Sequence, residues 1–254
     1  MMTRKTVFSL VAFLALSGAA VLGPKPLSGQ ESMGDFMFHP PRVTLTLNFG
    51  YGMPRAGSDI FQDVDTIFTL DKGDFRAPAI GGGLSVFLND RMDLAFEFSF
   101  ARSSTWSEYV DWVDDDDLPI EQETQFTRVP LTVSLRYFLM DRGREIGNLS
   151  WIPTTWAPYV GAGGGTMMYK FEQVGDFVDI EDLSIFGNSY VSQGWGWVGH
   201  VFGGVQWVLS PEWVLTAEGR YSLASADLER PTYRLYEPID LSGFQGSVGF
   251  GVRF

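Results

Sequence analysis

The sequence predicts an all-β protein: a transmembrane, antiparallel, up-and-down β-barrel of eight strands, with short periplasmic turns and long extracellular loops. Three observations predict this fold class. Apolar residues alternate with polar or small residues along eight segments of about ten residues each. Short and long connections alternate between these segments. The chain also begins with a pattern typical of exported proteins.

The composition excludes several classes of protein. Aromatic residues make up 15% of the 254 residues and charged residues only 19%, so a large apolar surface must be accommodated. The chain has no cysteine, which excludes disulfides and cysteine-based metal sites. The net charge of −13 argues against a nucleic-acid partner, because phosphate contacts require clustered Lys and Arg. After residue 30 no apolar run approaches the ~20 residues of a spanning helix, so a helical membrane protein is not expected.

The N-terminal residues have the pattern of a signal peptide. Arg4 and Lys5 precede an apolar run over residues 7–22 that ends in small residues. We expect a signal peptide over residues 1–29, cleaved after about Ala20 or Gly29. An uncleaved anchor is the competing interpretation, but the run is short for a spanning helix. Residues 30–41 are then a short periplasmic segment, and residues 42–254 form the barrel domain.

Eight segments have the period-two pattern of strands that present one face to each environment. In one of them, Leu131, Val133 and Leu135 alternate with Thr132 and Ser134. A strand of ~9–11 residues is long enough to cross a bilayer at a tilt. In chain order, the segments are 43–51, 78–88, 94–100, 129–139, 159–171, 195–209, 213–223 and 244–254.

The connections predict which ends of the strands share a side. Tight turns are expected across residues 89–91 and 210–212, and these would be periplasmic. Residues 140–156 form a longer connection on that same side. A ten-strand barrel stays open as an alternative, because residues 66–70 could extend a strand or add a hairpin. Long loops are expected at 53–76, 104–123, 173–193 and 225–241.

A soluble β-sandwich also alternates between a dry and a wet face. Aromatic residues near the ends of the predicted strands favour the barrel, since aromatic girdles are typical of the two membrane interfaces. The residues assigned to these girdles are Tyr51, Trp106, Tyr137, Trp156, Tyr159, Trp195, Trp207 and Trp213.

The C-terminal sequence GFQGSVGFGVRF, over residues 243–254, resembles the terminal strand of Gram-negative outer-membrane proteins. The segments 128–133 and 158–165 are similar to features of the eight-stranded OmpA- and OmpX-type barrel domain. The resemblance implies a place in the bacterial outer membrane, in contact with lipid and lipopolysaccharide. It also implies periplasmic chaperones and the barrel assembly machinery as partners, with an assembly signal formed by Phe244, Val248, Phe250, Val252 and Phe254.

The alternate face of the strands is expected to point into the lumen. A lone buried charge is costly, so we expect charges there to form pairs, with Glu97 and Glu218 as the acceptors. An eight-stranded barrel is only just wide enough to be filled by side chains, which favours a polar plug over a gated conduit. The predicted lumenal charge network comprises Glu97, Arg128, Arg136, Glu218, Arg220 and Arg253. Lys170, His200 and Gln206 are assigned to the same face.

No catalytic or metal-binding constellation is evident, and we expect no enzyme activity, no cofactor and no metal. The two histidines are His39, before the first strand, and His200, which has no neighbouring serine in the sequence. The acidic run 111–117 offers oxygen ligands for Ca²⁺, but it lacks the glycine and glutamate of an EF-hand loop. Trp106, Tyr109 and Trp112 beside it suggest an adhesive surface instead.

These observations lead to a non-enzymatic integral outer-membrane barrel with a structural or surface-interaction role and a plugged lumen. The alternative is a narrow pore or a transporter of small or apolar molecules. A continuous lumenal void, or a lateral gap at the glycine-rich segment 159–165, would favour transport. A lumen blocked by Glu–Arg pairs would favour the structural role. The residues identify no partner for the extracellular loops.

Overall fold

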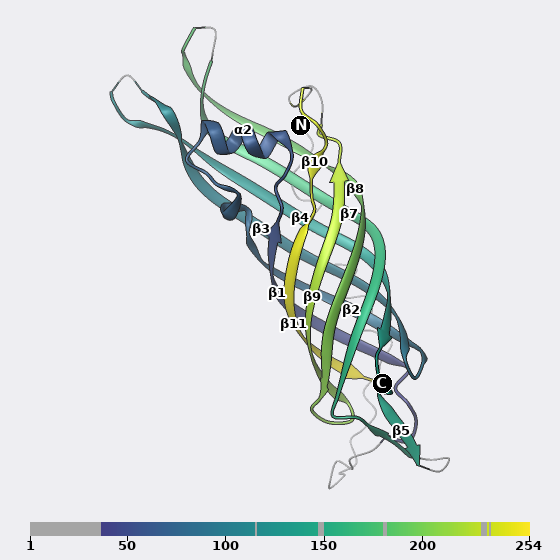
Figure 1. Cartoon of the computed structure of the whole chain (residues 1–254). Coiled ribbons are helices and arrows are strands. Elements are labelled where there is room, and N and C mark those ends of the chain that lie inside the picture. Colours follow the sequence, from purple (N-terminus) through teal and green to yellow (C-terminus); the bar gives the residue numbers. More distant parts are fainter. Residues whose placement is uncertain (1–36, 115, 147–149, 180–181, 230–232, 234) are drawn as a thin grey trace, which may run out of the picture. The chain divides into compact units, whose positions relative to one another are not determined.

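The computed structural model describes residues 37–254, except 115, 147–149, 180–181, 230–232 and 234 (Figure 1). The described residues all belong to one compact unit, Asp35–Phe254. The predicted signal peptide and the start of the segment 30–41 lie outside them. Within the described part, no helix is both long and apolar enough to cross a membrane.

Eight long antiparallel strands close into a ring, which confirms the predicted fold class. Neighbours in the chain are neighbours in the sheet, and the ring closes where β11 pairs with β1 and where β8 pairs with β9. Closure removes the unpaired edges that an open sheet would present. The strands are β1 (Val43–Pro54), β2 (Ala77–Asn89), β3 (Met92–Val113), β4 (Pro119–Phe138), β7 (Trp156–Val178), β8 (Ile185–Val208), β9 (Trp213–Ala226) and β11 (Gly243–Arg253).

The connections contain the remaining elements. The β1–β2 connection holds helix α2 (Asp59–Ile67) and the 3-10 helix η2 (Lys72–Phe75). Residues 66–70 therefore add no strand, and the ring has eight strands rather than ten. The connection between β4 and β7 folds back as a separate hairpin of β5 (Gly143–Ile146) and β6 (Ser150–Pro153). The short strand β10 (Ile239–Asp240) pairs with the end of β9.

Four of the strands are much longer than a membrane crossing requires. β3 and β4 span 22 and 20 residues, and β7 and β8 span 23 and 24. Figure 1 shows these two hairpins continuing past the ends of the shorter strands. The predicted loops 104–123 and 173–193 are therefore mostly strand, and the prediction was wrong there. Cross-strand pairs such as Thr105 with Thr124 continue the ladder with polar residues, which give no apolar alternation.

The period-two pattern of the sequence sorts the side chains between the two faces of the barrel. On β4, Leu131, Val133 and Leu135 are exposed on the outside, whereas Thr132 and Ser134 are buried inside. The outside of the barrel is thus apolar and its interior holds the buried polar residues, which is the reverse of a water-soluble protein. A hydrophobic core exists as well, but it lies inside the barrel near the long connections.

Candidate functional site: the barrel lumen

The centre of the lumen holds two carboxylates and two guanidinium groups from three strands. Glu97 comes from β3, Arg136 from β4, and Glu218 and Arg220 from β9. Nη2 of Arg220 lies 2.6 Å from Oε2 of Glu97 and 2.8 Å from Oε1 of Glu218. Nη2 of Arg136 lies 3.5 Å from Oε1 of Glu97 and 3.6 Å from Oε2 of Glu218. We call these four residues the charge quartet; its opposite charges balance.

Aromatic rings also contact the members of the quartet. The Tyr159 hydroxyl donates a hydrogen bond of 3.1 Å to Oε2 of Glu218. Cζ of Arg136 lies 4.6 Å from the centroid of the Tyr159 ring. Cζ of Arg220 lies 4.9 Å from the centroid of the Phe202 ring. These distances suit cation–π contacts, so the guanidinium groups are held by ring faces as well as by carboxylates.

A serine that was not expected lies beside His200. Ser134 comes from β4, and its Oγ lies 2.8 Å from Nε2 of His200 and 3.1 Å from Oε2 of Glu97, to which it donates. The Ser134 hydroxyl has one proton, which it donates to Glu97. In that arrangement Nε2 of His200 must carry the proton of the second hydrogen bond and donate it to Ser134. His200 is then not poised to take a proton from Ser134, as a catalytic base would be.

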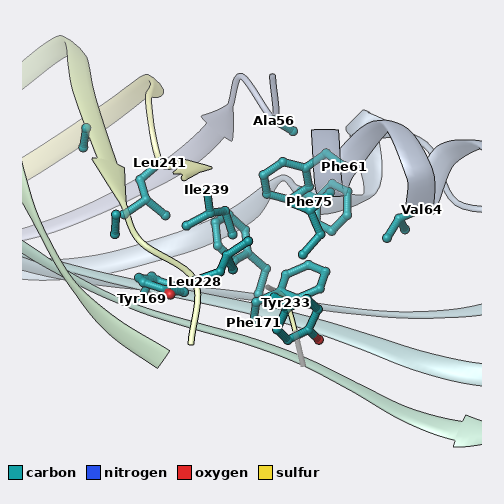
Figure 2. Close-up of a cluster of buried hydrophobic side chains, with 14 of the residues drawn as sticks. Ala56, Phe61, Val64, Phe75, Tyr169, Phe171, Leu228, Tyr233, Ile239 and Leu241 are labelled. Atoms are coloured by element: carbon teal, nitrogen blue, oxygen red, sulfur yellow. The ribbon is translucent and has the colours of Figure 1, made fainter. Parts of the chain in front are cut away.

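An apolar cap fills the end of the lumen next to the long connections (Figure 2). Phe61 of α2 packs edge-to-face on Phe75, Phe126 and Phe171, with ring centroids 4.8, 5.5 and 5.9 Å away. The last two rings project inward from β4 and β7. The cap is therefore built jointly by the β1–β2 connection and by the inner wall of the barrel.

Hydrogen bonds tie the cap to the β9–β11 connection. The amide of Gly57 donates to Oδ2 of Asp240 at 3.1 Å, and the amide of Glu237 donates to Oδ2 of Asp59 at 2.9 Å. Burial, together with a hydrogen bond to Asp63, raises the pKa of Tyr236 in the same connection to about 12. The two connections thus close over the lumen as one layer.

A second layer of side chains lies at the opposite end of the lumen. Nη1 of Arg142, in the β4–β5 connection, lies 2.8 Å from Oδ2 of Asp93. Arg253 of the terminal strand donates to Oε1 of Gln206 at 2.7 Å. Its Cζ lies 5.9 Å from the ring centroid of Trp151, which the β5–β6 hairpin brings under the barrel. Arg142 lies in a connection without periodicity, so no sequence pattern assigned it to the lumen.

The structure places the predicted lumenal charges in three groups. The quartet contains four of them, and Arg253 lies in the second layer, away from the quartet. Arg128 lies between the quartet and the apolar cap, and no described residue forms an ion pair with it. Asp93, which the prediction missed, has the same strand phase as Glu97, so an earlier start of this strand would have revealed it.

Three side chains point elsewhere than predicted. Lys170 faces outward on β7 and forms an ion pair with Glu172, which is two residues away on the same face. Tyr159 is buried in the lumen, so it does not belong to an outer aromatic girdle. Tyr109 also turns inward, where its ring centroid lies 4.6 Å from that of Phe68. The exposed tryptophans of this hairpin are Trp106 and Trp112.

The predicted assembly-signal residues lie along β11, at the seam where the ring closes. Phe244, Val248, Phe250 and Phe254 are exposed on the outer face, and Val252 is half-buried in the same row. The amide and carbonyl of Phe254 exchange hydrogen bonds with Val43. The terminal strand is thus paired on both sides along its whole length.

The glycine-rich segment 159–165 leaves no lateral gap. β7 pairs with β4 and with β8 in unbroken register through this segment. Glycine is required there by close approach: a Cβ on Gly163 would lie 2.4 Å from the carbonyl oxygen of Val133. The small residues therefore let neighbouring strands approach closely and do not open the barrel wall.

The acidic run is a hairpin tip stabilised by its own backbone. Oδ1 of Asp114 accepts hydrogen bonds from the amides of Asp116 and Leu118, at 2.9 and 2.8 Å. Among the residues that the structure covers, no group of three or more His, Cys, Asp or Glu side chains could hold a metal ion.

The chain matches no protein-family profile and no curated protein. It is similar in fold to solved outer-membrane proteins. OprG from Pseudomonas aeruginosa matches at 16% identity and a TM-score of 0.45, over 85% of this chain and 97% of that one. Neisserial surface protein A matches at 13% identity and a TM-score of 0.43, over 88% and 100%. Ail, the attachment invasion locus protein of Yersinia pestis, matches at 13% identity and a TM-score of 0.43, over 84% and 99%. The ring of eight strands is the architecture that the resemblance to OmpA- and OmpX-type domains implies.

Proposed function

We propose that this chain is a non-enzymatic integral protein of the bacterial outer membrane, with a closed lumen and a structural or surface-interaction role. One observation carries the proposal. The four charges of the quartet are paired across the lumen, while apolar side chains cover the outside of the ring. A barrel of this polarity is stable in a bilayer and is unfavourable in water.

The height of the apolar band supports a place in a membrane. On β8 three exposed residues of the outer face mark the apolar band: Trp197 at one end, Val201 near the middle and Trp207 at the other end. The ten residue-to-residue steps from 197 to 207 extend over roughly 33 Å at ~3.3 Å per step. With the tilt of ~40° that is usual for such barrels, they span about 25 Å, which equals the apolar height of known outer-membrane barrels.

The closed lumen argues against a transport role. A solute would have to pass the apolar cap with Phe61, then the quartet, then the layer that contains Arg142 and Arg253. A cavity of about 70 Å³ lies between these layers, and it does not amount to a channel. Separating the members of the quartet would leave buried charges without partners of opposite charge, which is costly.

The surface role rests on the two long hairpins. β3–β4 and β7–β8 both extend beyond the apolar band, and β3 presents Trp106 and Trp112 to solvent, the first with 68% of its surface exposed. The acidic residues Asp111 and Asp116 lie beside them, and both are exposed. Exposed tryptophans next to charges are typical of binding surfaces. We propose these hairpins as the part of the protein that meets a partner outside the cell.

We further propose that lipid and lipopolysaccharide surround the apolar band, and that the assembly machinery and periplasmic chaperones deliver the chain there. The outward row of Phe244, Val248, Phe250 and Phe254 supports the second point, since it is the part of the terminal strand that a docking surface can reach. Cell fractionation tests the location: the protein should be recovered with outer membranes, and recovery from the soluble periplasm would refute it.

Planar bilayer recording tests the closed lumen. The folded protein should insert without steady current steps, because no water-filled path connects the two ends. The Arg136→Ala variant breaks the quartet and serves as the comparison. Steady openings of the wild-type protein that disappear in Arg136→Ala would overturn the proposal, since they would mean that the quartet holds a conducting path open.

A further inference from the structure

Arg128 is a buried cation without a counter-ion. Its side chain projects inward from β4 and only 9% of its surface is exposed. No hydrogen bond or ion pair joins its guanidinium group to any described residue. Its one favourable contact is with a ring: Cζ lies 5.4 Å from the centroid of Phe126. A buried charge that no opposite charge balances is unfavourable, so its position demands an explanation.

The guanidinium group reaches across the lumen. Nη2 of Arg128 lies 3.1 Å from the point where a Cβ on Gly52 of β1 would be, so glycine at that position makes room for it. β2 and β3 lie between β1 and β4 in the ring. Arg128 therefore projects its charge into the lumen instead of folding back along its own strand.

The charges of the interior do not balance. The described lumenal side chains include five guanidinium groups, but only three carboxylates oppose them. The quartet is neutral, and Arg142 is neutralised by Asp93. The whole chain, by contrast, carries a net charge of −13. The guanidinium groups are those of Arg128, Arg136, Arg142, Arg220 and Arg253, and the carboxylates are those of Asp93, Glu97 and Glu218.

A cavity lies where the unpaired charge points. It has a volume of about 70 Å³, and its lining includes Arg128 together with neutral hydrogen-bond donors such as Asn48, Ser99 and Gln245. The carboxylates of Glu97 and Glu218 line it as well, but each is paired within the quartet, so Arg128 leaves the lining with one excess positive charge. A water molecule takes up ~30 Å³ in the liquid, so the cavity holds at most a few small species. A cation and several neutral donors around a small space form the environment that an anion requires.

We propose that this cavity binds one small monovalent anion of the halide class, with Arg128 as its counter-charge. The anion supplies the negative charge that the protein does not provide at this point of the lumen. A large anion such as gluconate does not fit beside the other polar side chains. The site is a component of the folded barrel, and it goes beyond the proposed role of the hairpins because it requires no partner.

Anion-dependent stability tests the proposal on the full folded chain in lipid nanodiscs. Urea unfolding is measured in sodium chloride and in sodium gluconate at equal ionic strength. A ligand that binds only the folded state raises the folding equilibrium constant by a factor of 1 + [L]/Kd, or about elevenfold at ten times Kd. We expect this rise for the wild type. Arg128→Gln should lose it, whereas Lys170→Gln, which removes an outer cation, should keep it.

A second measurement does not depend on any variant folding. Crystals of the wild-type protein grown with bromide should give an anomalous peak beside the guanidinium group of Arg128. Equal stability in the two salts, a chloride effect that Arg128→Gln retains, or a cavity that holds water and no bromide would each overturn the proposal.

Discussion

Replacing Glu97 by alanine removes the carboxylate that two guanidinium groups share at the centre of the lumen. Arg220 loses a partner at 2.6 Å and Arg136 loses one at 3.5 Å, while Ser134 loses its acceptor at 3.1 Å. Glu218 is then left to balance both arginines. Removing one member of a buried ion pair typically costs about 3–5 kcal/mol, and we expect a loss of that size in the free energy of unfolding.

A double-mutant cycle separates this pairing from general damage to the lumen. Arg220→Ala alone should cost a similar amount, because it leaves Glu97 and Glu218 with one arginine. The double variant retains the balanced pair of Arg136 and Glu218, whose atoms lie 3.6 Å apart. Its loss should be smaller than the sum of the single losses by about 1–3 kcal/mol, which is the usual range for residues in one network.

Urea titration of the protein in lipid vesicles, followed by tryptophan fluorescence, measures all three losses. Folding of each variant is checked first by its shifted mobility without heating in a denaturing gel. Additive losses, or single losses below about 1 kcal/mol, would refute the reasoning, since a buried and mutually dependent quartet predicts neither.

Three further experiments test the wall, the cap and the close approach of the strands. Phe98→Arg, on the lipid-facing side, should cost about 2–4 kcal/mol in vesicle unfolding, whereas Trp106→Arg, beyond the apolar band, should cost about 1 kcal/mol or less. Phe61→Ala should destabilise the cap by about 3–5 kcal/mol, seen as faster hydrogen exchange of the α2 amides; unchanged protection would contradict the packing. Gly163→Ala forces a Cβ against the backbone of β4 and should cost about 1–3 kcal/mol, while Gly199→Ala, which faces open space, should stay within about 0.5 kcal/mol; equal effects would contradict the register.

The sequence predicted those parts of the strands whose two faces lie in different environments. Lipid on one side and lumen on the other impose the alternation of residues such as Leu131 and Ser134. Beyond the membrane both faces of a strand tolerate polar residues, so the hairpin ladder of Thr105 and Thr124 gave no signal. Helix α2 was read as a possible strand from its final residues, although its apolar positions follow helical spacing.

The lumen was predictable to the extent that strand phase assigns a face. Phase correctly assigned Glu97 and Arg220 to the interior, but the contact of Ser134 with His200 depends on which strands lie opposite each other in the closed ring. No local pattern contains that information. Lys170 was assigned to the wrong face for a related reason. The glycine-rich part of β7 does not indicate which residues face the lumen, and the Lys170 side chain points outward.

Thiol labelling tests the closed lumen most directly, because the natural chain contains no cysteine. A single cysteine is introduced at Thr132, which is buried and lines the lumenal cavity, and in a second protein at Asp116, on the exposed β3–β4 tip. In nanodiscs both mouths of the barrel face water. A charged, water-soluble thiol reagent should label Asp116→Cys rapidly and should label Thr132→Cys only after unfolding. Rapid labelling of folded Thr132→Cys would show that water and solutes reach the lumen, and would contradict the closed barrel.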